Sequence, residues 1–229
     1  VAVGGDGTVN EVSQPLIGSD AIMGVIPAGS GNGLAHHLKI SSKIREAVEI
    51  INAGKVISID TCLVNDKNFL SIAGVGFDAR VARHFARVQQ RGFITYARMA
   101  LKEYFRYKPG KYTLTLNGNE RTVSAFFISF ANSNQFGYNA MIAPKASITD
   151  GMIDVCIASR PPVTAFPGLA HLLFMKRIDR SRYIETIRAS DILVRRKKGH
   201  TVNVDGEPLK MGTNLHIKIL PASLKITVP

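Results

Sequence analysis

The stretch VAVGGDGT at residues 1–8 carries a short apolar run directly into a glycine loop. Glycines let backbone N–H groups approach an anion without a Cβ in the way, and a helix that begins near Val9 would add the positive end of its dipole. Because like charges repel, Asp6 is interpreted as a partner of Mg²⁺ or as a general base rather than as a phosphate contact. Gly-Gly and Asp-Gly pairs also mark ordinary β-turns. The stretch alone therefore predicts either a phosphate-binding loop or a turn.

A second glycine loop, PAGSGNGLA, lies at residues 27–35 and also follows an apolar run. Residues 1–55 alternate between strand-like and helix-like hydrophobic patterns. Strands are predicted at 1–3 and 22–26, and helices at 9–16, 32–38 and 42–54. Such alternation is typical of a parallel sheet, in which loops at the carboxyl ends of neighbouring strands converge. We therefore expect both glycine loops to face one ligand.

From residue 56 onward the pattern changes mainly to strands. They are predicted at 57–64, 69–73, 112–116, 123–130, 153–158, 183–195, 201–204, 215–220 and 224–228. Asn117-Gly118 is the strongest short hairpin signal. Helical stretches are predicted at 79–107 and 163–176. The sequence thus predicts an incomplete α/β nucleotide domain of Rossmann type at 1–55, followed by an antiparallel β-sandwich or barrel domain at 56–229.

The composition is that of a folded protein with large cores. The chain has 229 residues, of which 45% are hydrophobic, and its two cysteines show no metal-ligand or disulfide spacing. Its longest apolar stretch is shorter than the roughly 20 residues that a membrane span requires. The chain begins on the strand that carries its first loop, so we expect a further segment before it.

Basic residues are concentrated in two zones of a chain whose net charge is +12. Residues 80–111 contain nine Lys or Arg and one acid, and residues 176–198 contain nine against three. On a helix, Arg80, Arg83, Arg87 and Arg91 would form one stripe. Such a stripe suits an anionic membrane or a nucleic acid, and it also suits a solvated helix face.

The two glycine loops together resemble the nucleotide site of the diacylglycerol kinase and sphingosine kinase group of lipid kinases. Three later segments extend this resemblance in the order that the family has them: GVGFDA at 74–79, TDGMIDV at 149–155 and VDGE at 204–207. Five ordered segments are far more specific than one glycine loop. The chain is therefore identified as similar to bacterial diacylglycerol kinase-like proteins.

This resemblance implies a kinase that uses ATP and Mg²⁺ to phosphorylate a lipid hydroxyl. The implied nucleotide contacts are Gly4, Gly5, Gly7, Thr8, Gly29, Ser30, Gly31, Asn32 and Glu207. Asp78 corresponds to a lipid headgroup contact of sphingosine kinase-like members, although an N-cap would explain it equally well. Candidate Mg²⁺ ligands are Asp6, Asp60, Asp150 and Glu207.

The general base is assigned to one of two carboxylates. The diacylglycerol kinase branch implies Asp205, whereas the sphingosine kinase branch implies Asp6. We favour Asp205, because the base must approach the alcohol rather than the phosphate. Gly33 departs from diacylglycerol kinase-like members, which often have an acidic residue there; sphingosine kinase-like members have a small one.

The expected partner is a lipid substrate at an anionic membrane surface, with no nucleic acid, and a homodimer is left open. The expected location is the cytoplasm, at the inner face of the membrane. Two alternatives to a lipid kinase remain: a soluble NAD kinase-like enzyme, since that family shares the motif at 4–8, and a non-catalytic fragment that binds membranes or nucleic acid.

Overall fold

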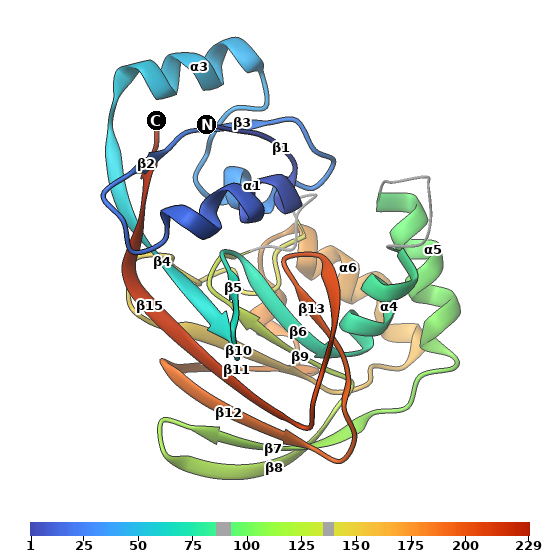
Figure 1. The fold of residues 1–229 in the computed structure, drawn as a ribbon. Helices are drawn as coiled ribbons and strands as arrows, with labels where there is room; N and C mark the ends of the chain where they lie inside the picture. The colour runs from blue at the N-terminus through green and yellow to red at the C-terminus, as the bar shows by residue number, and fades with distance from the viewer. Residues whose placement is uncertain (86–92, 135–139) are drawn as a thin grey trace.

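The computed structural model describes residues 1–85, 93–134 and 140–229. Its first part is a small α/β unit (Figure 1), in which β1 (Ala2–Gly4) pairs in parallel with β3 (Val25–Pro27). Three helices accompany these strands: α1 (Asp6–Ser13), α2 (Gly33–His37) and α3 (Ile44–Ala53). Both glycine loops leave the carboxyl ends of the parallel strands, as the sequence predicts.

The predicted strand at 22–26 is in fact two short strands that join different sheets. β2 (Ile22–Met23) pairs with the last strand of the chain, whereas β3 pairs with β1. Gly24 separates them, and a Cβ at this position would lie 2.9 Å from Cδ1 of Ile51 on α3. A side chain at position 24 would therefore have to displace the end of the Ile51 side chain.

The remainder of the chain folds mainly as two antiparallel sheets that enclose one hydrophobic core, which confirms the predicted fold class. One sheet has the order β11-β10-β9-β6-β13-β14, and the other has the order β5-β4-β15-β12-β7-β8. The strands are β4 (Val56–Val64), β5 (Lys67–Phe69), β6 (Ile72–Gly76), β7 (Gly110–Leu116), β8 (Asn119–Ala125), β9 (Phe127–Ala131), β10 (Ile153–Ala158), β11 (Ile184–Ala189), β12 (Asp191–Arg196), β13 (His200–Val204), β14 (Glu207–Met211) and β15 (Asn214–Thr227).

Three predicted strands, at 69–73, 123–130 and 183–195, are each divided in the structure. Each division lies where the chain crosses from one sheet of the sandwich to the other, at Leu70-Ser71, Phe126 and Ser190. The hydrophobic pattern continues through such a corner, because the residues on both sides of it face the same core. β14 was not predicted at all.

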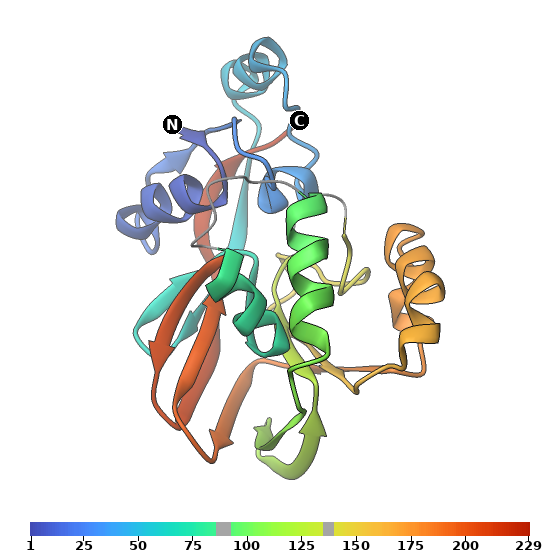
Figure 2. The same cartoon turned by 90° about the vertical axis from the view of Figure 1, so that its right-hand side faces the viewer.

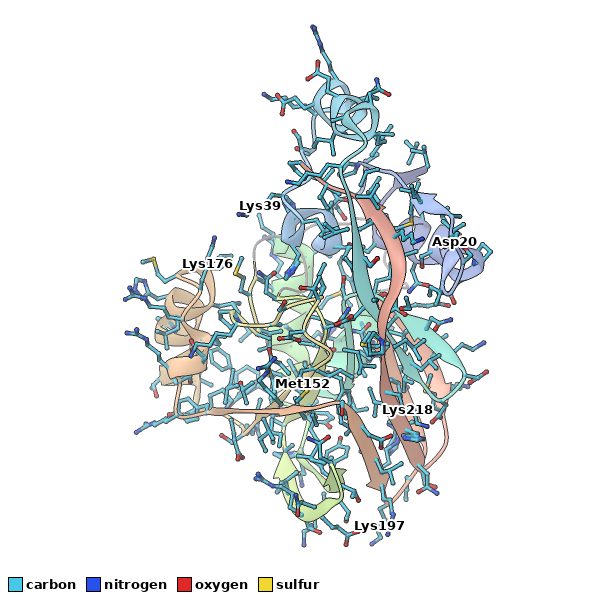
Figure 3. The ribbon with its side chains drawn as sticks, turned by 90° about the vertical axis from the view of Figure 1, so that its left-hand side faces the viewer. Asp20, Lys39, Met152, Lys176, Lys197 and Lys218 are labelled. Carbon is cyan, nitrogen blue, oxygen red and sulfur yellow. The ribbon has the colours of Figure 1, made fainter. Side chains whose placement is uncertain are left out.

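The long strand β15 joins the sandwich to the α/β unit. It pairs with β4 along most of its length and contains an irregularity between Leu220 and Leu224. Beyond this bulge, Leu224, Ile226 and Val228 pack with the apolar residues of β1 and β3. Figure 3 shows this strand rising from Lys218 toward the α/β unit. The predicted domain boundary at residue 55 stays a prediction, because β4 and β15 contribute to both cores.

The remaining helices lie outside the sandwich (Figure 2). The predicted helix at 79–107 consists of α4 (Phe77–Phe85) and α5 (Phe93–Tyr104), and α6 (Phe166–Phe174) covers the second predicted stretch. Arg87 and Arg91, half of the predicted basic stripe, lie outside the described residues. Within the described residues, no helix is long and apolar enough to cross a membrane.

Candidate active site

The two glycine loops touch each other at Gly5 and Gly29. A Cβ at Gly5 would lie 3.1 Å from Cα of Gly29, and a Cβ at Gly29 would overlap Cα of Gly5. Ala28 N–H also donates to the carbonyl of Gly4 at 2.9 Å. The two loops therefore form one continuous backbone surface, as their place after neighbouring parallel strands predicts.

Asn32 closes the second loop through its side chain. Its Oδ1 accepts the N–H of Gly29 at 3.0 Å, and its Nδ2 donates to the carbonyl of Gly29 at 2.8 Å. Asn32 is buried and has the left-handed φ of 51° that asparagine tolerates well. Its amide thus shapes the loop, whereas the predicted nucleotide contacts Thr8 and Ser30 are exposed.

Asp6 begins α1 and faces the second loop. Its Oδ1 accepts the N–H of Gly33 at 2.6 Å, and a Cβ at Gly31 would lie 2.7 Å from its Oδ2. Burial raises the pKa of the Asp6 carboxyl, and the negative charge of Asp205 raises this pKa further. The hydrogen bond from the N–H of Gly33 acts in the opposite direction and lowers the pKa. The backbone N–H of Gly33, at the start of α2, thus holds the Asp6 carboxylate against the second loop.

Asp205 lies at the tip of the hairpin between β13 and β14. Asp205 and Gly206 have φ values of 45° and 90°, which are those of a type I′ turn. The Asp205 carboxylate accepts four hydrogen bonds: its Oδ1 from the N–H groups of Ser71 and Ile72, both at 2.9 Å, and its Oδ2 from the N–H of Leu70 and from Asn10 Nδ2, both at 2.7 Å.

These four donors fill the roughly four lone-pair positions of a carboxylate. Burial nevertheless raises the pKa of Asp205, and the hydrogen bonds offset this only in part. A raised pKa suits a group that accepts a proton. Three of the donors belong to the backbone corner between β5 and β6, so Asn10 is the one that can move aside without unfolding this corner.

Asn10 is a site residue that the sequence analysis missed. Besides Asp205, its side chain contacts Gln14, whose Nε2 donates to Asn10 Oδ1 at 2.8 Å. Asn68 Nδ2 in turn donates to Gln14 Oε1 at 2.9 Å. This polar chain connects α1 of the α/β unit to the sandwich. The sequence feature that could have indicated this contact is the pair Asn10 and Gln14, two polar residues four positions apart after the first loop.

Asp60, a predicted Mg²⁺ ligand, is buried and already has backbone partners for both oxygens. Its Oδ1 accepts the N–H of Ala222 at 2.7 Å, and its Oδ2 accepts the N–H of Gly151 at 2.8 Å. The carboxylate therefore joins the β15 bulge to the loop before β10. Its role in metal binding stays a prediction.

The other predicted acidic residues lie in different surroundings. Asp150 forms an ion pair with Arg188, which also faces the buried Asp154 at 3.8 Å. Glu207 is exposed at the start of β14. In the part of the chain that the structure describes, no three His, Cys, Asp or Glu side chains form a ready metal cluster. Asp6 is the predicted ligand beside both loops, and Mg²⁺ commonly takes one or two carboxylates together with waters and phosphates.

Asp78 lies inside the first turn of α4, so the alternative interpretation of an N-cap is wrong. The residue is buried, and its Oδ2 accepts Asn203 Nδ2 at 2.8 Å. Asn203 Oδ1 also accepts the N–H of Gly206, at 3.0 Å. Asp78 is thus connected to the hairpin that carries Asp205, and a role in lipid binding stays a prediction.

Replacing Gly29 by alanine should separate the two loops. Because the new Cβ would overlap Gly5 and lie 2.8 Å from Asn32 Oδ1, we expect a loss of about 1–3 kcal/mol of unfolding free energy and weaker ATP binding. Denaturant unfolding and nucleotide titration measure the two effects. Gly168→Ala in α6, where a Cβ meets nothing within 4 Å, is the matched control and should leave both unchanged or raise stability slightly. Equal behaviour of the two variants would contradict the close packing of the loops.

Comparison with known proteins agrees with this arrangement. A diacylglycerol kinase catalytic domain family model matches residues 1–64, and the model of the YegS C-terminal NAD kinase beta sandwich-like domain matches residues 71–228. Lipid kinase YegS of Escherichia coli strain K12 is 30% identical over 236 residues, which cover 100% of this chain and 77% of that protein.

Solved structures share the fold. A diacylglycerol kinase from Bacillus anthracis str. Sterne has a TM-score of 0.76 at 19% identity, covering 99% of this chain and 75% of that chain. An NAD kinase from Archaeoglobus fulgidus in complex with ATP has a TM-score of 0.53 at 14% identity, covering 98% and 75%. On the extent of the sequence matches, this chain belongs to the YegS family of lipid kinases, with a diacylglycerol kinase-type catalytic domain.

Proposed function

We propose that the protein transfers the γ-phosphoryl group of ATP to the hydroxyl of a lipid, either diacylglycerol or a sphingoid-like alcohol, with the help of Mg²⁺. The observation that carries this proposal is the contact of the two glycine loops at Gly5 and Gly29, with the carboxylate of Asp6 held against the second loop by the N–H of Gly33. Phosphoryl transfer depends mainly on positioning and on neutralisation of charge. Backbone donors and two carboxylates of raised pKa supply the groups that this chemistry requires.

Each residue of the site has a proposed role. The amides of the two loops bind the phosphates, and Asp6 holds Mg²⁺, which when bound neutralises charge on the transferred group. Asp205 accepts the hydroxyl proton while the lipid oxygen bonds to the γ-phosphorus and the bond to the bridging oxygen of ADP breaks. Asn10 positions Asp205 and gives up its hydrogen bond when the alcohol approaches.

The site of action in this proposal is an anionic membrane surface on the cytoplasmic side. The excess of positive charge supports it, because a Lys or Arg close to such a surface contributes about 1 kcal/mol to binding.

The test is an assay with labelled ATP on the protein expressed from its complete gene, with diacylglycerol, monoacylglycerol, sphingosine, ceramide and NAD offered separately. We expect label in an organic-extractable product that forms only when Mg²⁺ is present. The structural likeness to an NAD kinase makes NAD the main competing acceptor. Label found only in water-soluble NADP would overturn the lipid proposal, and no transfer to any acceptor would favour a non-catalytic protein.

A further inference from the structure

A strongly basic pocket of about 390 Å³ lies between α4, the segment that enters β7, and the connection from β12 to β13. This volume is within the roughly 300–1,000 Å³ range of small-molecule sites. Seven cationic side chains line the pocket and no acidic one does: Arg80, Arg83, Lys108, Lys111, Arg196, Lys197 and Lys198. The pocket therefore suits a compact anion.

Most of this charge has no acidic partner. Glu103 pairs with Arg80, but among the described residues no acidic side chain lies within ion-pair distance of Arg83, Lys108, Lys111, Lys197 or Lys198. The buried Arg196 donates to the backbone carbonyls of His200, Met211 and Gly212, at 2.9–3.0 Å. In the part of the chain that the structure describes, no carboxylate pairs with this guanidinium, and a charged guanidinium that lines the pocket can attract an anion there.

The pocket is distinct from the candidate active site. It is lined by His200 and Thr201 at the start of β13, whereas Asp205 follows the end of the same strand. Five residues of extended chain separate His200 from Asp205, which corresponds to roughly 16 Å. Neither glycine loop lines the pocket.

The helix α5, whose Glu103 pairs with Arg80 of the pocket, also carries exposed apolar side chains. Ile94 and Leu101 are 66% and 48% exposed, and Phe105, directly after the helix, is 65% exposed. Their spacing of seven and four residues places them on one side, flanked by Arg98 and Lys102. Such a side is typical of helices that lie in a membrane interface. Tyr107 and Lys108 of the pocket follow Phe105 closely in the chain.

We infer that this pocket binds the phosphomonoester headgroup of an anionic lipid while the exposed side of α5 contacts the acyl region of the membrane. Charge complementarity selects the phosphate, and the exposed apolar side chains of the helix that leads through Phe105 into the pocket favour a lipid over a free phosphate or a nucleic acid. The inference rests on the proposed function, because a lipid phosphomonoester is the chemical class of the kinase's own product. Product already in the membrane would then hold the enzyme at the surface where its substrate lies.

The test compares two double variants that remove equal charge. Arg83→Gln/Lys198→Gln alters the pocket, whereas Arg177→Gln/Lys218→Gln removes two exposed cations elsewhere; Figure 3 labels Lys218 on β15. Binding is measured to vesicles of phosphatidylcholine with phosphatidic acid, and to vesicles with phosphatidylserine adjusted to the same surface potential. We expect the pocket variant to lose about 30-fold in affinity for phosphatidic acid vesicles and the control variant less than about 3-fold. A third variant, Ile94→Gln/Leu101→Gln, should weaken vesicle binding but not the binding of a water-soluble short-chain phosphatidic acid.

Several outcomes would overturn the inference. Equal losses of affinity in the two double variants would show that the vesicles attract the protein's overall positive charge rather than the pocket. Equal affinity of the unaltered protein for phosphatidic acid and phosphatidylserine vesicles would rule out specific recognition of the phosphomonoester. If inorganic phosphate displaces the protein from phosphatidic acid vesicles as well as short-chain phosphatidic acid does, the ligand of the pocket is a free anion rather than a lipid. A single-stranded oligonucleotide whose binding alone depends on the pocket would make it a nucleic-acid site. The pocket variant should keep its kinase activity on lipid dispersed in detergent. If the unaltered protein also shows no kinase activity, the proposed function is contradicted, but the proposed phosphate binding in the pocket is not.

Discussion

Replacing Asp6 by asparagine should lower kcat by about 10³-fold and at the same time make the protein more stable at neutral pH. Activity falls because the variant loses the carboxylate proposed to hold Mg²⁺ beside the phosphates. Stability rises because the fold raises the pKa of Asp6, which means that it disfavours the charged form. Asparagine can keep the hydrogen bond from Gly33 without that charge. We expect a gain of about 1 kcal/mol, or about 2–4 °C in Tm.

The pH dependence of this gain follows from the direction of the shift. Above the raised pKa of folded Asp6, the unaltered protein carries the disfavoured charge and the variant is the more stable of the two. As the pH falls through that pKa toward 3.8, the ordinary pKa of an aspartate side chain, the folded carboxyl takes up its proton and the difference disappears. Thermal unfolding from pH 4 to pH 8 measures this effect.

Asp66→Asn is the matched control, because Asp66 is an exposed carboxylate in a turn. It should change neither turnover nor stability by more than a small amount. An Asp6→Asn protein with normal turnover would move the metal-binding role elsewhere. A variant less stable than the unaltered protein at pH 7 would contradict the proposed cost of the buried charge.

The sequence predicted those parts of the site that depend on local chemistry. Both glycine loops and the strand before the first of them are encoded by adjacent residues, and the structure agrees with each of them. The contact between the loops also followed, because it depends only on the geometry of parallel strands.

The parts that could not be predicted depend on contacts between distant residues. Asp60 reaches amides that are 91 and 162 residues away in the chain, and Asp205 reaches its backbone donors across 133 to 135 residues. A carboxylate suited to a metal cannot be distinguished in sequence from one that will accept backbone N–H groups. The divided strands, at 22–26, 69–73, 123–130 and 183–195, have the same origin, because a hydrophobic pattern does not record which sheet a residue joins. Asn10 was missed because its partner lies 195 residues away.

Replacing Asp205 by asparagine should reduce turnover by about 10³-fold while the turn itself stays intact. Asn-Gly is a preferred pair for a type I′ turn, and this chain uses it at Asn117-Gly118, where φ is 48° and 87°. The new side chain can still accept the N–H groups of Ser71 and Ile72 through its oxygen. Its amide would, however, face two donors, from Leu70 and Asn10, which should cost about 1–3 kcal/mol of stability. Single-turnover kinetics and denaturant unfolding measure the two losses separately.

The double variant Asn10→Asp/Asp205→Asn separates a catalytic base from a structural anchor. A carboxylate at position 10 can accept from the amide at 205 and from Gln14, so the pair regains a hydrogen bond and part of the lost stability. It places the base on α1 rather than on the hairpin, so turnover should stay low. If turnover returns in proportion to stability, Asp205 acts by holding the corner between β5 and β6, and the base is then Asp6. If turnover stays low in a double variant that has regained stability, Asp205 is the group that accepts the proton. The missing carboxylate at position 205 is then what still distinguishes this variant from the unaltered protein.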